Sequence, residues 1–300
     1  MGIMLILDTE KETEEKTMRN FAIVTDSACD IDAKTLKDWD VSCVKLSFRF
    51  EGEDQEYTEM PVLDFYNRMK GGAVARTAAA NMGDFRAAFE PLLKEGKDIL
   101  YVGFSSGLST TSNAAAMAAE ELREEYPDAV IETIDTLCAS AGEGLMVKLA
   151  VDKRSGGSDL AQTAQYVRET FPKISHWFTV DDLGYLKRGG RISPTLAFVG
   201  GLLNIKPVLH VDDEGHLISM SKVKGRKAAL GALMKRLQDT RLDGPIMICQ
   251  ADCREEADGL ARIIEEKTGE AVCYIADIGP VIGAHAGPGT IAVFFLANER

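Results

Sequence analysis

Arg191 has surroundings in this sequence that suit the binding of an anion. It follows Gly189 and Gly190 in a tight turn, after a predicted short helix and just before Ser193 and Pro194, which are typical of the start of another helix. Gly189 is the expected left-handed end of the first helix. A guanidinium held beside the free N–H groups of a helix start suits a carboxylate or a phosphate. The alternative is an arginine that merely pairs with a neighbouring Asp.

Hydroxyl groups gather in a second segment, where the predicted strand 98–104 runs into a turn that contains Ser105, Ser106 and Ser109. A helix is predicted from about residue 112 to residue 125. A strand, a hydroxyl-rich turn and a helix start together supply backbone N–H and hydroxyl donors for an anion. This turn is therefore a second candidate for an anion site.

The same turn also fits a hydrolase. Residues Gly103 to Gly107 match G-x-S-x-G, the nucleophile elbow of α/β-hydrolases, with Ser105 as the nucleophile. Asp277 and His285 follow in the order that such a triad requires. The alternative function is thus a serine hydrolase, esterase-like, that uses Ser105 and His285. A five-residue pattern with three fixed positions arises readily by chance, so we prefer binding to hydrolysis.

Polar residues at two further places are candidates. Asp26 and Ser27 follow the predicted buried strand 20–25, and open α/β sheets build their sites at the carboxyl ends of strands. Capping of the next helix is an equally good interpretation of this pair. His285 lies in a predicted loop, 278–289, whose Gly, Ala and Pro residues let a ligand approach the backbone closely. The other three histidines are interpreted as structural.

Composition limits the class of protein. The chain has 300 residues, with 45% hydrophobic and 27% charged residues, as in ordinary globular proteins. Its net charge of −13 argues against nucleic acid or an anionic membrane surface as the main partner. Six scattered cysteines form neither a disulfide framework nor a zinc motif, which favours a reducing cytoplasm. The sequence contains no apolar run of the ~20 residues that span a membrane, and we expect no metal.

Strands and helices alternate along the chain. Residues 1–19 are interpreted as an appended leader. An N-terminal domain, 20–171, has predicted strands at 20–25, 42–48, 98–104 and 129–135, a polar hairpin at 50–57, and a small-residue loop at 75–81. A C-terminal domain, 172–300, begins with a predicted strand at 174–179 and the helix pair around Arg191. It continues with the hairpin 205–223, helices at 225–237 and 254–267, and further strands. This alternation predicts an α/β fold with a parallel or mixed sheet flanked by helices.

Several motifs, in order, resemble one family. They are VDDLGYLKRGGRIS and LLNIKPVL within residues 180–209, together with TDSACDI, FSSGLSTT, IDTLCASAGEG, KVKGRKAAL and IGPVIGAHAGPG. This pattern resembles the DegV family, the bacterial fatty-acid-binding proteins, over nearly the whole chain after about residue 20. The resemblance implies a two-domain fold with a mostly parallel N-terminal sheet, a smaller C-terminal domain with a mixed sheet, and the ligand between them.

The resemblance also implies a function. The best-understood members are the lipid-carrying subunits of a fatty-acid kinase, so the implied ligand is a long-chain fatty acid in a buried tunnel, without a cofactor. A separate ATP-dependent kinase would phosphorylate the carboxylate to an acyl phosphate. The chain itself has no P-loop and no protein-kinase signature, so we expect no enzyme activity without the partner. A lipid chaperone or sensor without a kinase partner is a further alternative.

The resemblance assigns roles to particular residues. It implies that Thr77, Arg191, His285 and one of Ser105 and Ser106 hold the carboxylate of the fatty acid. Asp26, Ser27, Ser109, Gly189 and Gly190 are secondary candidates. The sequence departs from the family pattern in several places. The family usually has Ser at Ala78 and Pro-Ser two residues later, which is missing here, Gly at Thr110 and Thr at Ala286.

Overall fold

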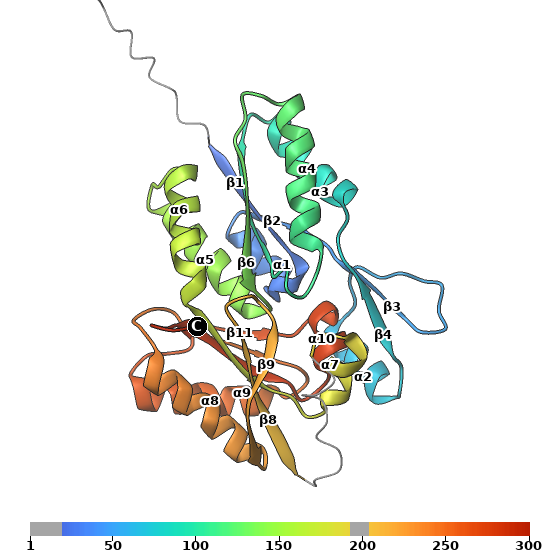
Figure 1. Ribbon diagram of the computed structural model, residues 1–300, viewed down its shortest axis with the longest axis vertical. Helices are drawn as coiled ribbons and strands as arrows, with labels where there is room; N and C mark the ends of the chain where they lie inside the picture. Colours follow the sequence, from blue (N-terminus) through green and yellow to red (C-terminus); the bar gives the residue numbers. More distant parts are fainter. Residues whose placement is uncertain (1–19, 193–203) are drawn as a thin grey trace, which may run out of the picture.

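The computed structural model describes residues 20–192 and 204–300. The N-terminal half is built on a sheet of four parallel strands in the order β2-β1-β5-β6 (Figure 1). Its two central strands are buried almost throughout, as continuous hydrophobic runs in parallel sheets usually are. The strands are β1 (Phe21–Asp26), β2 (Val41–Val44), β5 (Asp98–Phe104) and β6 (Ile131–Cys138).

Helices cover both faces of this sheet. α3 and α4 pack together on one face, and α5 and α6 pack on the other (Figure 1). Two of these helices begin with a capping box, in which the side chain of the capping residue accepts a hydrogen bond from a backbone N–H of the first turn. Asn81 caps α3 in this way, and Asp159 caps α6. The helices are α1 (Ala33–Asp38), α3 (Met82–Lys94), α4 (Thr111–Glu125), α5 (Ala141–Ser155) and α6 (Leu160–Thr170).

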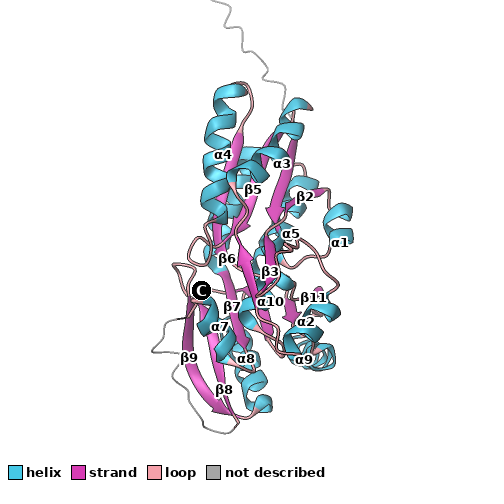
Figure 2. Ribbon diagram, turned by 90° about the vertical axis from the view of Figure 1, so that its right-hand side faces the viewer, coloured by secondary structure: helices cyan, strands magenta, loops and turns pink. Residues whose placement is uncertain are grey.

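The C-terminal half is built on a mixed sheet of six strands in the order β11-β10-β12-β7-β8-β9. Its strands β7, β8 and β9 lie side by side in Figure 2. Only β10 and β11 run parallel, and the other neighbours are antiparallel. Helices α8 (Arg226–Thr240) and α9 (Arg254–Thr268) cover one face. The strands are β7 (Ile174–Thr179), β8 (Ile205–Val211), β9 (Leu217–Lys224), β10 (Met247–Gln250), β11 (Tyr274–Asp277) and β12 (Ile291–Leu296).

Helix α5 joins the two sheets. It contacts β1 and β5 of the first sheet and β7, β10 and β12 of the second. One cluster of buried side chains accordingly includes Leu100 from β5, Met146 from α5 and Phe294 from β12. The predicted α/β fold, with a parallel N-terminal sheet and a mixed C-terminal sheet, is confirmed. The domain boundary at residues 171 and 172 stays a prediction.

A small layer completes the structure beside the two sheets. β3 (Ser47–Phe50) and β4 (Ala75–Ala78) form an antiparallel pair, and α2 (Val62–Lys70) packs there through aromatic contacts of Phe65 with Phe48 and Phe50. Two short helices, α7 (Leu183–Gly189) and α10 (Pro280–Ala286), pack against each other, and α10 also contacts β4.

Several sequence predictions were wrong in detail. The predicted strand 42–48 is two strands in different sheets, because the chain leaves the first sheet after Val44. The predicted hairpin 50–57 is reduced to one bridge between Phe48 and Tyr57, since the full partner of β3 is β4. That strand occupies the first part of the predicted loop 75–81. The predicted loop 278–289 contains α10, which Pro280 opens at a position that suits proline.

Two predictions lie outside the described residues: the leader 1–19 and the helix start at Ser193 and Pro194. None of the helices that the structure describes combines the length and apolar composition needed to cross a membrane.

Gly142 and Gly144 allow α5 to pack closely against its neighbours. A Cβ atom on Gly142 would lie 2.2 Å from Nε2 of His176 on β7, so only a hydrogen fits there. Gly231 in α8 provides a contrast, because a Cβ atom there would meet no heavy atom within 4 Å.

Gly142→Ala should therefore lower the free energy of unfolding by about 1–3 kcal/mol, because the methyl group forces α5 away from β7. Gly231→Ala, also inside a helix, should instead raise it by about 0.5–1 kcal/mol. Urea denaturation of both variants measures these changes. Equal effects of the two substitutions would contradict the close contact between α5 and β7.

Candidate functional site

A cavity of about 540 Å³ is bounded by elements of both sheets and of the small layer. Its volume lies within the usual range for small-molecule sites. One wall is α10, whose cavity-facing residues recur at helical spacing and so share one face of the helix. Together with the residue two positions ahead of the helix, they are Ile278, Val281, Ile282, His285 and Ala286.

Most of the wall is apolar. Phe178 on β7 and Phe294 on β12 line the cavity, as do their cross-strand partners Ala292 and His176, so one face of this strand pair forms a wall. The first sheet contributes Phe104, and the other apolar side chains include Leu46, Leu108, Leu186, Val211 and Leu217. His176 adds no free polar atom, because Nδ1 pairs with the Ile174 carbonyl and Nε2 accepts from the Ala139 N–H.

Polar side chains meet at one end of α10. The Thr77 hydroxyl on β4 lies 2.8 Å from Nε2 of His285, although the two residues are 208 positions apart. Gly189 makes room for the imidazole: a Cβ atom there would lie 2.1 Å from Nδ1 of His285. Gly190, which lines the cavity, has φ 70° and is the left-handed end of α7. The prediction of Gly189 in that role was wrong by one residue.

Arg191 is fixed at this end by two backbone carbonyls. Its Nε donates to the Leu108 carbonyl at 3.1 Å, and its Nη1 donates to the Gly189 carbonyl at 2.5 Å. The guanidinium thus bridges the turn after β5 and the end of α7. Within residues 20–192 and 204–300, no carboxylate forms an ion pair with it. Its positive charge therefore lines the cavity without a partner carboxylate from the described residues.

The imidazole beside it is neutral at physiological pH. Burial, and after it the positive charges of Arg191 and Arg76, lower the pKa of His285 to about 4. Its Nδ1 is buried and has no hydrogen-bond partner in the described part of the chain. The cationic group of this polar end is therefore Arg191, while His285 and Thr77 provide hydrogen-bonding groups.

The two serines after β5 point to different places. Ser105 is fully buried, donates its hydroxyl to the Gly215 carbonyl at 2.9 Å and accepts from the Gly107 N–H at 3.1 Å. It therefore docks the turn of the β8–β9 hairpin on the first sheet, and it does not line the cavity. Ser106 and Ser109 do line the cavity. The geometry thus favours Ser106 over Ser105 as a ligand contact.

Asp26 and Ser27 serve the scaffold in this structure. The buried carboxylate of Asp26 accepts from the Tyr101 hydroxyl at 2.6 Å, the Phe104 N–H at 3.1 Å and the Ala28 N–H at 3.0 Å. The Ser27 hydroxyl accepts from the Leu46 N–H. Neither side chain lines the cavity. Burial raises the pKa of Asp26, and these three hydrogen bonds lower it in part.

The three residues of the hydrolase hypothesis have separate partners. The Ser105 hydroxyl donates to Gly215, the His285 imidazole pairs with Thr77, and Asp277 accepts from the side-chain amide of Gln250. A triad instead needs the nucleophile, the base and the acid in one hydrogen-bonded chain. The arrangement therefore argues against hydrolysis by Ser105.

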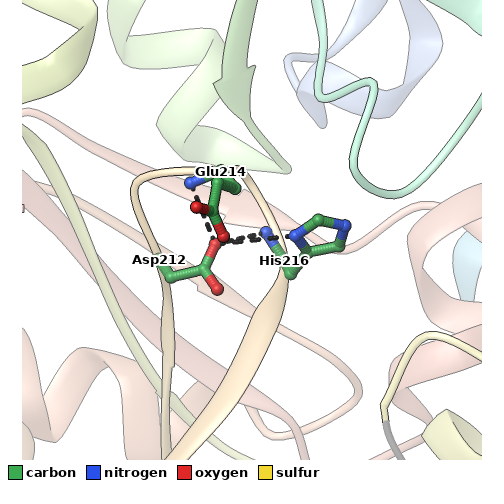
Figure 3. A group of neighbouring side chains, drawn as sticks. All are labelled: Asp212, Glu214 and His216. Atoms are coloured by element: carbon green, nitrogen blue, oxygen red, sulfur yellow. Dashed lines mark hydrogen bonds and ion pairs between the residues drawn. The ribbon is translucent and has the colours of Figure 1, made fainter.

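Three potential metal ligands gather at the tip of the β8–β9 hairpin: Asp212, Glu214 and His216 (Figure 3). One carboxylate oxygen of Asp212 accepts from the backbone N–H groups of Glu214 at 3.1 Å and His216 at 2.8 Å. The side chains of Glu214 and His216 are exposed. These bonds close the turn that docks on Ser105, and we assign the cluster this structural role.

The fold and the cavity define a class: an α/β protein of two sheets that enclose an apolar cavity with one polar end. The family described as "Uncharacterised protein, DegV family" matches residues 20–298. A DegV domain-containing protein of Clostridium perfringens is 42% identical over 290 residues, which cover 94% of this chain and 99% of the relative. This chain therefore belongs to the DegV family.

Solved structures agree with this assignment. A DegV lipid-binding protein of Thermotoga maritima has a TM-score of 0.81 and 27% identity, over 94% of this chain and 99% of its own. A DegV protein of Thermus thermophilus, described for its fatty-acid binding, has a TM-score of 0.82 and 26% identity, over 93% and 99% of the two chains. The family that the sequence motifs indicated is confirmed.

The low pKa of His285 predicts a pH-dependent stability. In the unfolded chain the residue binds a proton near its ordinary pKa of 6.5, and in the folded protein only near 4. Between these values the unfolded state holds more protons, so this residue makes the free energy of unfolding rise from pH 4 to pH 6.5 and adds no slope above. The contribution is on the order of 2–3 kcal/mol.

His285→Gln should remove this contribution, since glutamine does not titrate and can still reach Thr77. Denaturant unfolding between pH 4 and pH 7 should therefore give a shallower curve for His285→Gln than for the wild type. Parallel curves for wild type and His285→Gln would show that the imidazole is not held neutral by its site.

Proposed function

We propose that this protein binds a long-chain fatty acid and presents it to a separate ATP-dependent fatty-acid kinase. The acyl chain occupies the cavity, and Thr77, Ser106, Arg191 and His285 hold the carboxylate, with Ser109 and Gly190 beside them. One observation carries the proposal: the apolar cavity has a fixed cation at one end that no carboxylate of the described residues neutralises.

Affinity and orientation come from different parts of this ligand. Burial of a methylene group contributes roughly 0.8 kcal/mol, so about fourteen of them contribute on the order of 11 kcal/mol before costs. Association and ordering remove an estimated 4–15 kcal/mol of this. A charge-assisted bond between the carboxylate and Arg191 then sets which end of the molecule enters first.

The relatives support this ligand class. The Thermus protein binds fatty acid and the Thermotoga protein binds lipid, and each shares the fold over more than nine-tenths of this chain. Because the identities are 26% and 27%, the ligand carries over as a class rather than as one particular acid.

The polar end is suited to holding a carboxylate while a partner acts on it. A neutral imidazole and two hydroxyls orient the head group. The imidazole pairs with the Thr77 hydroxyl, but its Nδ1 has no partner among the described residues, so no nucleophile–base–acid chain forms there. In the proposed reaction a carboxylate oxygen attacks the γ-phosphorus of ATP, the acyl phosphate forms and ADP leaves. Arg191 would stabilise the charge that builds up as the phosphoryl group arrives. ATP and its site belong to the kinase, in a reducing bacterial cytoplasm.

Arg191→Ala tests the ligand assignment. Loss of a charge-assisted hydrogen bond should weaken the binding of octadecanoic acid roughly tenfold to a hundredfold. Octadecanol has the same tail without the charge, so its affinity should change by less than about threefold. Displacement of a fluorescent fatty-acid probe from delipidated protein measures both.

The matched control is Arg188→Ala, which removes an exposed arginine three residues earlier that stacks on Tyr185. It should leave both affinities near the wild-type values. If the wild type binds neither octadecanoic acid nor octadecanol, the proposed function is wrong. If Arg191→Ala weakens the acid and the alcohol equally, the carboxylate is not at Arg191.

The purified protein should show no ATP hydrolysis, with or without octadecanoic acid. Addition of a fatty-acid kinase should give acyl phosphate, which hydroxylamine traps as a hydroxamate that mass spectrometry detects. Steady ATP turnover by the chain alone would contradict the role of a carrier subunit. A protein that binds the acid but supports no kinase would instead be a lipid chaperone or sensor.

A further inference from the structure

A second polar point lies on the cavity wall, away from Arg191. Ser140, which precedes α5, lines the cavity and is 5% exposed. Its hydroxyl donates to Oδ2 of the buried Asp30 at 2.5 Å, and Oδ1 of Asp30 accepts from the Gly279 N–H at 2.8 Å. This hydroxyl does not cap its own helix. The carboxylate of Asp30 orients the Ser140 hydroxyl instead.

The length of α10 gives the distance between Ser140 and the polar end at Arg191. Gly279, bonded to Asp30, immediately precedes the helix, whereas His285 is its second-last residue. Six residues at 1.5 Å each separate the two positions by about 9 Å along the helix axis. Ser140 and Gly279 share the partner Asp30, so Ser140 lies near the Gly279 end of α10, and we take about 9 Å as its separation from the carboxylate end.

The backbone around Ser140 is strained. Ser140 has φ 54° and ψ −144°, outside the region that residues with a side chain favour. Leu137 and Asp30 also have positive φ, at 53° each. Such conformations cost on the order of 1–3 kcal/mol each and tend to occur at functional sites. Glycine would relieve the strain at position 140, so the serine side chain is present at a cost in stability.

Ser140 suits a ligand group that donates a hydrogen bond. Burial raises the pKa of Asp30 to about 7, so above pH 7 its ionised carboxyl takes the single proton of Ser140 and leaves the oxygen lone pairs of Ser140 to accept. A saturated acyl chain offers no donor to this point. An extended chain advances ~1.2 Å per bond, so 9 Å corresponds to roughly eight bonds from the carboxyl carbon.

We propose that Ser140 accepts a hydrogen bond from an in-chain hydroxyl group near carbons 8 to 10, so that the cavity prefers mid-chain hydroxylated fatty acids. This inference rests on the proposed function and narrows its ligand class. The hydroxyl of the ligand donates to Ser140, Ser140 donates to Asp30, and Asp30 is held by Gly279.

The test compares 10-hydroxyoctadecanoic acid with octadecanoic acid by displacement of a fluorescent fatty-acid probe. The wild type should bind the hydroxy acid more tightly by about fivefold to tenfold, the value of one hydrogen bond. Ser140→Gly should abolish this preference while it relieves the backbone strain, so a folded variant is expected. Ser155→Gly, at the exposed far end of α5, is the matched control and should keep the preference.

A positional control uses 2-hydroxyoctadecanoic acid, whose hydroxyl lies beside the head group. Its affinity relative to octadecanoic acid should be the same in the wild type and in Ser140→Gly. A wild type that binds both acids equally, or a preference that survives in Ser140→Gly, overturns the inference and leaves the proposed function intact. Binding of none of these acids overturns both.

Discussion

A guanidinium held by two backbone carbonyls at the end of an apolar cavity is the interaction on which the rest of this site depends. The carbonyls belong to Leu108, after the first sheet, and to Gly189, at the end of α7, so the cation also joins two parts of the fold. The net charge of this protein is −13, so carboxylates that could pair with an arginine outnumber the basic side chains. Arg191 instead donates to two neutral carbonyls and lies at the cavity wall, so its positive charge remains available for a ligand.

The groups around this cation are arranged so that they add no second charge. His285 is half-buried between Thr77 and Gly189 and lies close to two arginines, so its neutral form is favoured. A neutral imidazole can donate or accept, depending on its tautomer, and therefore adapts to the protonation state of its partner. At Gly189, only a hydrogen atom fits against Nδ1 of the imidazole. The position of the imidazole is thus decided by steric contact as much as by hydrogen bonding.

Other polar residues near the strand ends hold the scaffold that forms the cavity. Asp26 binds Tyr101 and the backbone at Phe104, and Ser105 binds the hairpin tip at Gly215. Both side chains are fully buried, where an unpaired polar group would be costly. Together with α5, which contacts both sheets, these bonds keep two surfaces at the separation that leaves a cavity between them. Ser140, which Asp30 holds, adds a polar point to a wall that is mostly apolar.

The sequence by itself determined the elements and the kinds of chemistry available. Hydrophobic runs and periodicity are local properties, so strands such as Asp98–Phe104 and Ile174–Thr179 could be predicted to the residue. The motifs indicated the family, and the residue types indicated an anion. Sequence periodicity failed where a strand pairs with a distant segment. It predicted one strand where the structure has β2 and β3 in different sheets, and a loop where β4 pairs with β3.

Only the tertiary structure decided which polar side chains face the cavity. Ser105 and Ser106 are neighbours in one turn, yet a change of one position turns the first hydroxyl toward the hairpin and leaves the second residue on the cavity wall. Thr77 meets His285 across 208 residues, and Ser140 meets Asp30 across 110. A cavity is the space left when surfaces from distant parts of the chain pack together. Its lining is therefore set by long-range contacts, which no local pattern in the sequence contains.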